Sequence, residues 1–114
     1  MQIKQKDNTT VFLWEKTDPR GTDFRNLLKA HYKNMENQNI VVDLSTYENI
    51  STRDVLEFSE LSVYNKEKVS KSFIVVTGVM QIDALPENIS TAPTLQEALD
   101  LVEMEEIERD LGYL

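Results

Sequence analysis

The chain has 114 residues, 40% of them hydrophobic and 28% charged, which suits one soluble globular domain over residues 1–114. It has no cysteine, which excludes disulfides and thiolate metal sites, and its net charge of −8 disfavours nucleic-acid binding. No apolar run approaches the roughly 18 residues of a membrane span, and the N-terminus is polar, unlike a signal peptide, so we expect a cytoplasmic protein without membrane contact.

The N-terminal part predicts a β-hairpin followed by a helix. Gln2–Lys6 resembles a polar edge strand, and Thr9–Glu15 contains a continuous apolar run, typical of a strand covered on both faces. Asp7 and Asn8 between them favour a turn. Thr22 is then placed to cap a helix. His31 falls on the apolar stripe of that helix, so we expect a boundary histidine with a hydrogen-bonded ring.

The middle of the chain predicts buried strands that alternate with helical segments. Ile40–Leu44 is predicted as a buried strand, Phe73–Val76 is a continuous apolar run, and a helix is expected between them from Thr52 to about Asn65. Residues 79–90 have no clean period, and we expect only a turn and a short strand near Ile89–Thr91. Strands alternating with helices predict an α/β fold with a four- to five-stranded mixed sheet and helices packed against it.

The last predicted helix covers about residues 94–111 and is strongly acidic. Thr94 and Glu97 have the spacing of a capping box, and Gly112 is a natural stop. Residues 97–110 contain seven acidic residues and one arginine, which gives them most of the net charge of the chain. An acidic helix can attract a basic protein surface, although acidic residues also serve solubility alone.

Two apolar stripes lie on different sides of this helix. The first stripe packs on the domain and would continue at position 106, which is Glu106. Its members are Leu95, Ala98, Leu99 and Val102. Met104, Ile107 and Leu111 lie on roughly the opposite side. Three interpretations follow: the helix kinks and folds back, the second stripe is a homodimer or partner surface, or the tail is frayed and exposed.

The residue types of common catalytic sites are not assembled. Ser45, Ser51 and Thr52 are nucleophile candidates, but the chain has one histidine, and it lies on another element. Glu103 with Glu106 could hold a divalent cation, yet such pairs are more typical of a solvated face. We therefore expect no enzyme, no metal and no cofactor.

The segment from Ser51 to Asp54 has the pattern of a helix start. Ser51 has Asp54 three residues later, close to a capping box, and Thr52 then lies in the first turn. Free backbone N–H groups collect there and could accommodate a phosphate. The plainer interpretation is that Ser51 and Thr52 only cap the helix.

Two stretches of the chain resemble a STAS-like domain, the fold of the anti-anti-sigma factors and of the cytoplasmic domain of sulfate transporters. Residues 43–52 (DLSTYENIST) are similar to the family's strand–loop–helix segment, and residues 92–99 (APTLQEAL) to the lead into its final helix. The element order agrees over essentially the whole chain. The resemblance implies a STAS-like fold and a non-catalytic regulatory role.

The family's phosphorylation segment is altered in this chain. In the bacterial antagonists it reads Asp-Ser-Ser/Thr-Gly, and its first hydroxyl residue is phosphorylated by a kinase anti-sigma factor. Here the same positions read Ser51-Thr52-Arg53-Asp54. The resemblance therefore implies Thr52 as the phosphoacceptor, with Ser51 as a weaker candidate. Ser51 replaces the acid and Asp54 the glycine, so the chain resembles a divergent member with a degenerate segment.

Residues 104–112 resemble the tails of small stand-alone STAS-like proteins of Bacteroidetes-type bacteria, which are sometimes labelled ribonuclease Z. That nuclease uses many metal-binding histidines, and this chain has one, so the nuclease label does not fit.

Together these features predict a regulatory domain that works by protein–protein contact. The expected partner is a kinase-like or anti-sigma-like regulator. The alternatives are an oligomerisation module using the last helix, with a homodimer, and a small-ligand-binding domain with residues 79–85 as a pocket wall. The expected partner-binding residues are Ser51, Thr52, Arg53, Asp54, Met104, Ile107 and Leu111.

Overall fold

The computed structural model of the protein describes residues 1–78, 85–86 and 88–114. Its centre is a five-stranded sheet in the order β1-β2-β3-β4-β5. The first pair of strands is antiparallel and the later pairs are parallel, which confirms the predicted α/β class and mixed sheet. The strands are β1 (Gln2–Lys6), β2 (Thr9–Leu13), β3 (Asn39–Asp43), β4 (Phe73–Val76) and β5 (Ser90–Ala92).

The predicted hairpin is confirmed. Gln2 pairs with Leu13 and Lys6 with Thr9, so the two residues Asp7 and Asn8 make the turn. Asp7 has a φ of 56°, a left-handed conformation that aspartate tolerates better than most residues. All five residues of β1 are exposed, as expected for a polar edge strand.

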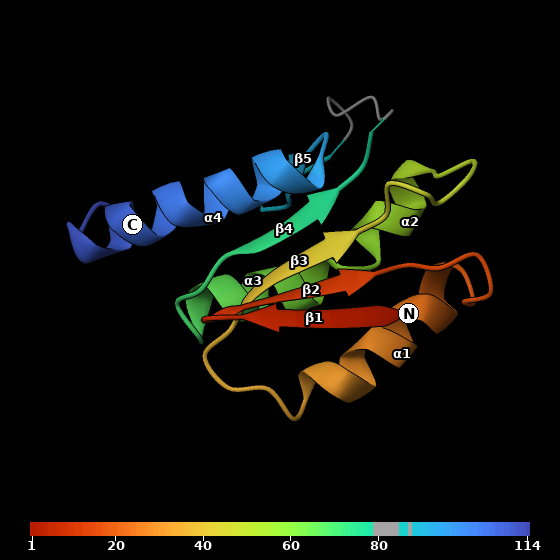
Figure 1. Cartoon of the computed structure of the whole chain (residues 1–114), viewed down its shortest axis with the longest axis horizontal. Helices are drawn as coiled ribbons and strands as arrows, with labels where there is room; N and C mark the ends of the chain where they lie inside the picture. The colour runs from red at the N-terminus through yellow and green to blue at the C-terminus, as the bar shows by residue number, and fades with distance from the viewer. Residues whose placement is uncertain (79–84, 87) are drawn as a thin grey trace.

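The sheet separates two cores because side chains alternate along each strand. Ile40 and Val42 of β3 point into one core, Val41 points into the other, and all three are fully buried. Helices α1 (Gly21–Tyr32), α2 (Thr52–Leu56) and α3 (Ser59–Glu67) supply side chains to the first core. Helix α4 (Leu95–Asp110) packs on the second core, on the other side of the sheet (Figure 1).

Two details of the first predicted helix are wrong. Arg20 occupies the N-cap, and Thr22 lies inside α1, where its hydroxyl donates to Glu57 at 2.8 Å. His31 is exposed, and its ring makes no hydrogen bond to the residues that the structure describes. Tyr32 is turned inward instead and packs against the core.

The single helix expected from Thr52 to Asn65 is also wrong, because it divides at Phe58. The Phe58 N–H donates to the Val55 carbonyl three residues back, at 3.1 Å, which is the tighter pattern of a 3₁₀ turn. Both residues are buried, and the Phe58 ring lies 6.2 Å from Phe24 and 6.4 Å from Phe73. The break therefore directs both side chains into the core between the helices and the sheet.

The acidic last helix forms over the predicted range and is continuous. The Thr94 hydroxyl accepts a hydrogen bond from the Glu97 N–H at 3.1 Å, which is half of the predicted capping box. At the other end, the N–H groups of Gly112 and Tyr113 donate to Arg109 and Glu108. Gly112 has a φ of 80°, so it ends α4 in a Schellman motif as its position predicted.

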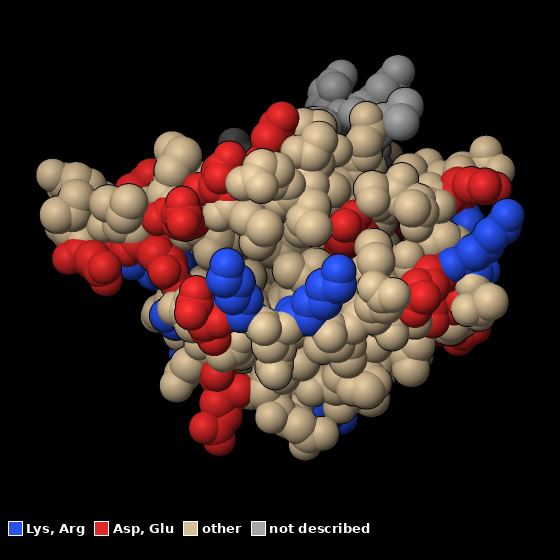
Figure 2. Space-filling view, viewed as in Figure 1, with Lys and Arg blue, Asp and Glu red and all other residues tan. Residues whose placement is uncertain are grey.

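Figure 1 shows the C-terminal end of α4 projecting beyond the strands, and Figure 2 shows acidic side chains gathered along α4 on the same face. The short strand predicted near residues 89–91 is confirmed as β5. The pocket wall predicted at residues 79–85 lies outside the described residues, apart from Leu85. In the described part of the chain, no helix is long and apolar enough to cross a membrane.

Candidate functional site

The first predicted surface, Ser51 to Asp54, is the N-terminus of α2. The Ser51 hydroxyl accepts from the Asp54 N–H at 3.3 Å, and the Asp54 carboxylate accepts from the Ser51 N–H at 2.9 Å. These reciprocal bonds complete a capping box. Thr52 is partly buried, whereas Ser51 and Arg53 are exposed. The geometry therefore confirms the plainer interpretation for Ser51, which caps the helix together with Asp54, whereas Thr52 takes no part in the capping box.

Asp54 also joins α2 to two other segments. Tyr47, in the loop after β3, donates its hydroxyl hydrogen to Asp54 at 3.1 Å and accepts from the Gly21 N–H at 2.9 Å. Burial raises the pKa of the Tyr47 hydroxyl above its ordinary value. The guanidinium of Arg20 lies 3.9 Å from the centre of the Tyr47 ring. Through Tyr47, Asp54 thus connects the start of α2 with the loop after β3 and the start of α1.

We expect Asp54→Ala to lower the free energy of unfolding by about 1.5 kcal/mol, because it removes the cap and the partner of the Tyr47 hydroxyl. Guanidinium denaturation measures this change. Asp23→Ala is the matched control, since Asp23 is an exposed acid in the first turn of α1 and should change stability by about 0.5 kcal/mol or less. Equal effects of the two variants would contradict the role of Asp54.

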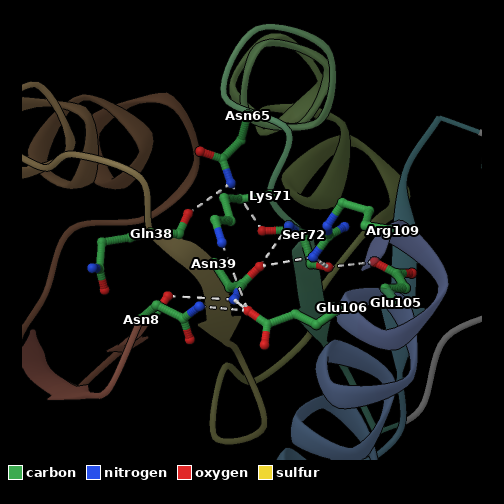
Figure 3. Close-up of polar contacts among 9 residues, drawn as sticks. All are labelled: Asn8, Gln38, Asn39, Asn65, Lys71, Ser72, Glu105, Glu106 and Arg109. Carbon is green, nitrogen blue, oxygen red and sulfur yellow. Dashed lines mark hydrogen bonds and ion pairs between the residues drawn. The ribbon is translucent and has the colours of Figure 1, made fainter. Parts of the chain in front are cut away.

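The second predicted surface is held in place by a group of polar side chains that we name the anchor cluster. Asn39 is fully buried at the start of β3 and occupies its centre. Its amide nitrogen donates to Glu106 at 2.5 Å, and its amide oxygen accepts from the Ser72 N–H at 2.8 Å and from Arg109 at 3.2 Å. Figure 3 shows these side chains converging from separate elements. The cluster consists of Asn8, Asn39, Lys71, Ser72, Glu105, Glu106 and Arg109.

The remaining bonds of the anchor cluster bring α4 against the starts of β3 and β4. Glu106 also accepts from the Asn8 amide at 2.6 Å and lies 3.9 Å from the Lys71 ammonium. Ser72 donates its hydroxyl hydrogen to Glu105 at 2.5 Å and accepts from Arg109 at 3.1 Å. Two acids and the one basic residue of α4 are therefore directed at the domain, so the second half of the helix is docked by polar contacts.

The opposite side of this half-helix is exposed. Met104, Ile107 and Leu111 are 56%, 59% and 62% exposed, and we name them the outer stripe. Because α4 is continuous through Asp110, the interpretation in which the helix kinks and folds back is wrong. The third interpretation is confirmed in its exposure and wrong in its fraying, since the tail is exposed but the helix ends in an ordered hydrogen-bonded motif. A contact surface stays a prediction that is consistent with this geometry.

The anchor cluster was not predicted from the sequence, in which Glu103 and Glu106 are more typical of a solvated face. The available signal was Glu106, which interrupts the inward stripe where an apolar residue was expected. A polar residue at an inward position requires a buried partner, and here the partners are Asn8 and Asn39.

A cleft of about 670 Å³ lies between the C-terminal ends of α1 and α3. Tyr32 and Tyr64 form part of its wall, with their ring centres 6.4 Å apart. Tyr32 donates its hydroxyl hydrogen to Asn65 at 2.8 Å, and burial raises the pKa of Tyr32 to about 12. The residues that line the cleft include both lysines and glutamates, so they favour neither an anionic nor a cationic ligand.

Within residues 1–78, 85–86 and 88–114, no group of three histidine, aspartate or glutamate side chains is arranged to hold a metal ion. The candidate nucleophiles Ser45, Ser51 and Thr52 lie around the loop between β3 and α2, while His31 lies near the other end of α1. The structure therefore does not bring these residues together. No protein-family model matches the chain, and no curated protein matches it significantly.

Proposed function

We propose that the chain is a non-catalytic regulatory domain that binds a protein partner, and that it is a divergent relative of the STAS-like anti-sigma factor antagonists. The observation that carries the binding role is the outer stripe, which stays exposed on a helix that the anchor cluster holds rigidly. Exposed apolar stripes on ordered helices are typical of contact surfaces. The order of strands and helices supports the relationship to the STAS-like family.

The two predicted surfaces lie at opposite ends of the molecule. Figure 1 places α2 near one end of the longest axis and the C-terminus of α4 near the other, and the principal extents are 39 × 32 × 23 Å. We propose the outer stripe as the main partner surface. Thr52 and Arg53 form a separate surface, in which Thr52 is the proposed phosphoacceptor and Ser51 the weaker one.

The proposed function is tested by substitution of Ile107. A photo-crosslinking amino acid at position 107 first captures the partner in the cells that make the protein, and the purified partner is then titrated against variants. We expect Ile107→Ser to weaken binding at least about tenfold, as for a central interface residue, while the free energy of unfolding changes by less than about 0.5 kcal/mol. The small stability change is expected because Ile107 is 59% exposed.

The matched control is Ile3→Ser, since Ile3 is an exposed isoleucine on the edge strand β1. If partner binding survives Ile107→Ser but is lost with Thr52→Asp plus Arg53→Glu, the partner binds the first predicted surface, Ser51 to Asp54, and not the outer stripe. Binding unaffected by all of these variants would refute both surfaces.

The alternative function is a homodimeric oligomerisation module built on the same stripe. Sedimentation at high concentration distinguishes this alternative from binding of a different protein. A dimer of the native chain that dissociates on Ile107→Ser would favour the oligomerisation module. A monomer would favour a different protein as partner.

A further inference from the structure

The outer stripe has the spacing of a coiled-coil seam. Met104, Ile107 and Leu111 are separated by three and four residues, which are the a, d and a positions of a heptad. The intervening b, c and f positions are Glu105, Glu106 and Arg109, and their side chains are bonded to the domain through the anchor cluster. The part of α4 that remains available is thus the side a second helix would use.

The positions beside the seam are all acidic. In the same heptad, Glu103 and Asp110 occupy g positions and Glu108 occupies the e position. Glu103 and Asp110 are exposed, and Glu108 is partly exposed. Arg109, the only basic residue of α4, donates to Asn39 and Ser72 on the opposite side of the helix. The apolar seam is therefore bordered by negative charge on both sides.

This charge pattern disfavours a second copy of the chain as the occupant. In a parallel pair of helices, Glu103 of one copy would face Glu108 of the other, because g residues meet the next e residues. In an antiparallel pair, Glu103 would face Asp110 of the other copy. Both arrangements juxtapose like charges, and this repulsion opposes the pairing of two copies through the seam.

We infer that the outer stripe binds a helix of opposite pattern, with apolar residues at its a and d positions and lysine or arginine at its e and g positions. Its apolar side chains would cover Met104, Ile107 and Leu111, and its cations would pair with Glu103, Glu108 and Asp110. The inference rests on the proposed function, because it defines the partner chemistry of the same surface.

Two designed helical peptides test this chemistry. Both have isoleucine and leucine at a and d, and one has lysine and the other glutamate at e and g. Fluorescence anisotropy of the labelled peptides against the whole protein is the measurement. We expect the lysine peptide to bind at least about tenfold more tightly than the glutamate peptide, and its affinity to fall as salt is added. Ile107→Ser should abolish this binding.

The decisive variant is Glu103→Lys with Asp110→Lys, which should reverse the preference toward the glutamate peptide. Asp23→Lys with Glu60→Lys is the matched control, because both are exposed acids on α1 and α3. It makes the same change in net charge elsewhere, and should keep the preference for the lysine peptide.

Each other outcome contradicts a defined part of the inference. Equal binding of both peptides, still sensitive to Ile107→Ser, would overturn the charge selection and leave the proposed function intact. Binding of the lysine peptide that the control variant weakens as much as Glu103→Lys with Asp110→Lys would show general charge attraction. No binding of either peptide would overturn the helical partner, while crosslinking from position 107 tests the proposed function independently. A native dimer would identify a second copy as the occupant.

Discussion

Replacing Asn39 with alanine should lower the free energy of unfolding by about 3 kcal/mol, because it leaves the buried Ser72 N–H without a partner and removes a hydrogen bond from each of two charged side chains. The Asn39 side chain is fully buried and bonds to the Ser72 N–H, to Glu106 and to Arg109. Truncation leaves the Ser72 N–H without an acceptor and weakens the contacts of Glu106 and Arg109, which keep their bonds to Asn8 and to the Ser72 hydroxyl. The measurement is equilibrium unfolding in guanidinium, and Asn34→Ala, at an exposed position, is the control.

The same substitution should release the second half of α4 before the rest of the fold. Hydrogen exchange of the amides of residues 103–110 should accelerate more than exchange in β3 and β4, because the anchor cluster is what docks that half. A loss below about 1 kcal/mol, or uniform acceleration over the whole chain, would show that the cluster does not hold the helix. The outer stripe would then lack the rigid support on which its proposed role depends.

Replacing Phe58 with alanine should cost about 4 kcal/mol, which is a large share of the stability of a domain of this size. Phe58 is 2% exposed at the break between α2 and α3 and lies close to Phe24 and Phe73. Its removal opens a cavity that links α1, α3 and β4, and a close-packed core relaxes only partly around such a gap. Calorimetric or guanidinium unfolding measures the change.

Tyr64→Ala is the control for this substitution, since Tyr64 is an aromatic residue of α3 that is 54% exposed. We expect it to cost about 1 kcal/mol or less. Equal destabilisation by the two variants would contradict the structure, in which Phe58 points into the core and Tyr64 is exposed to solvent. The comparison therefore tests the orientation of α3 as well as the packing of Phe58.

The two substitutions address different sides of the sheet. Phe58 belongs to the core between the sheet and α1 to α3, and Asn39 holds α4 on the opposite side. A partner that binds the outer stripe should raise the free energy of unfolding of the Asn39→Ala variant only if α4 remains docked on the sheet in that variant. Stability and binding can thus be separated by choosing substitutions on one side or the other.

The class of the fold and the positions of most elements could be predicted from the sequence. The apolar runs at residues 40–42 and 73–76 predict strands covered on both faces, and β3 and β4 are buried along their whole length. The start and end of α4 were predictable because Thr94 and Gly112 act through bonds to residues close in sequence. The outer stripe was predictable for the same reason, since it depends on the helical period alone.

The way in which α4 is docked, and the set of its charged side chains that face solvent, could not be predicted from the sequence. Asn8, Asn39, Ser72 and Glu106 are far apart in the sequence, and no local pattern places them together. A buried polar group is stable only with a partner, so Glu106 indicated that a partner existed without identifying Asn39. This docking turns Glu105 and Glu106 toward the domain and leaves Glu103 and Asp110 exposed. The docking therefore also sets the charge of the surface that we propose as the partner site.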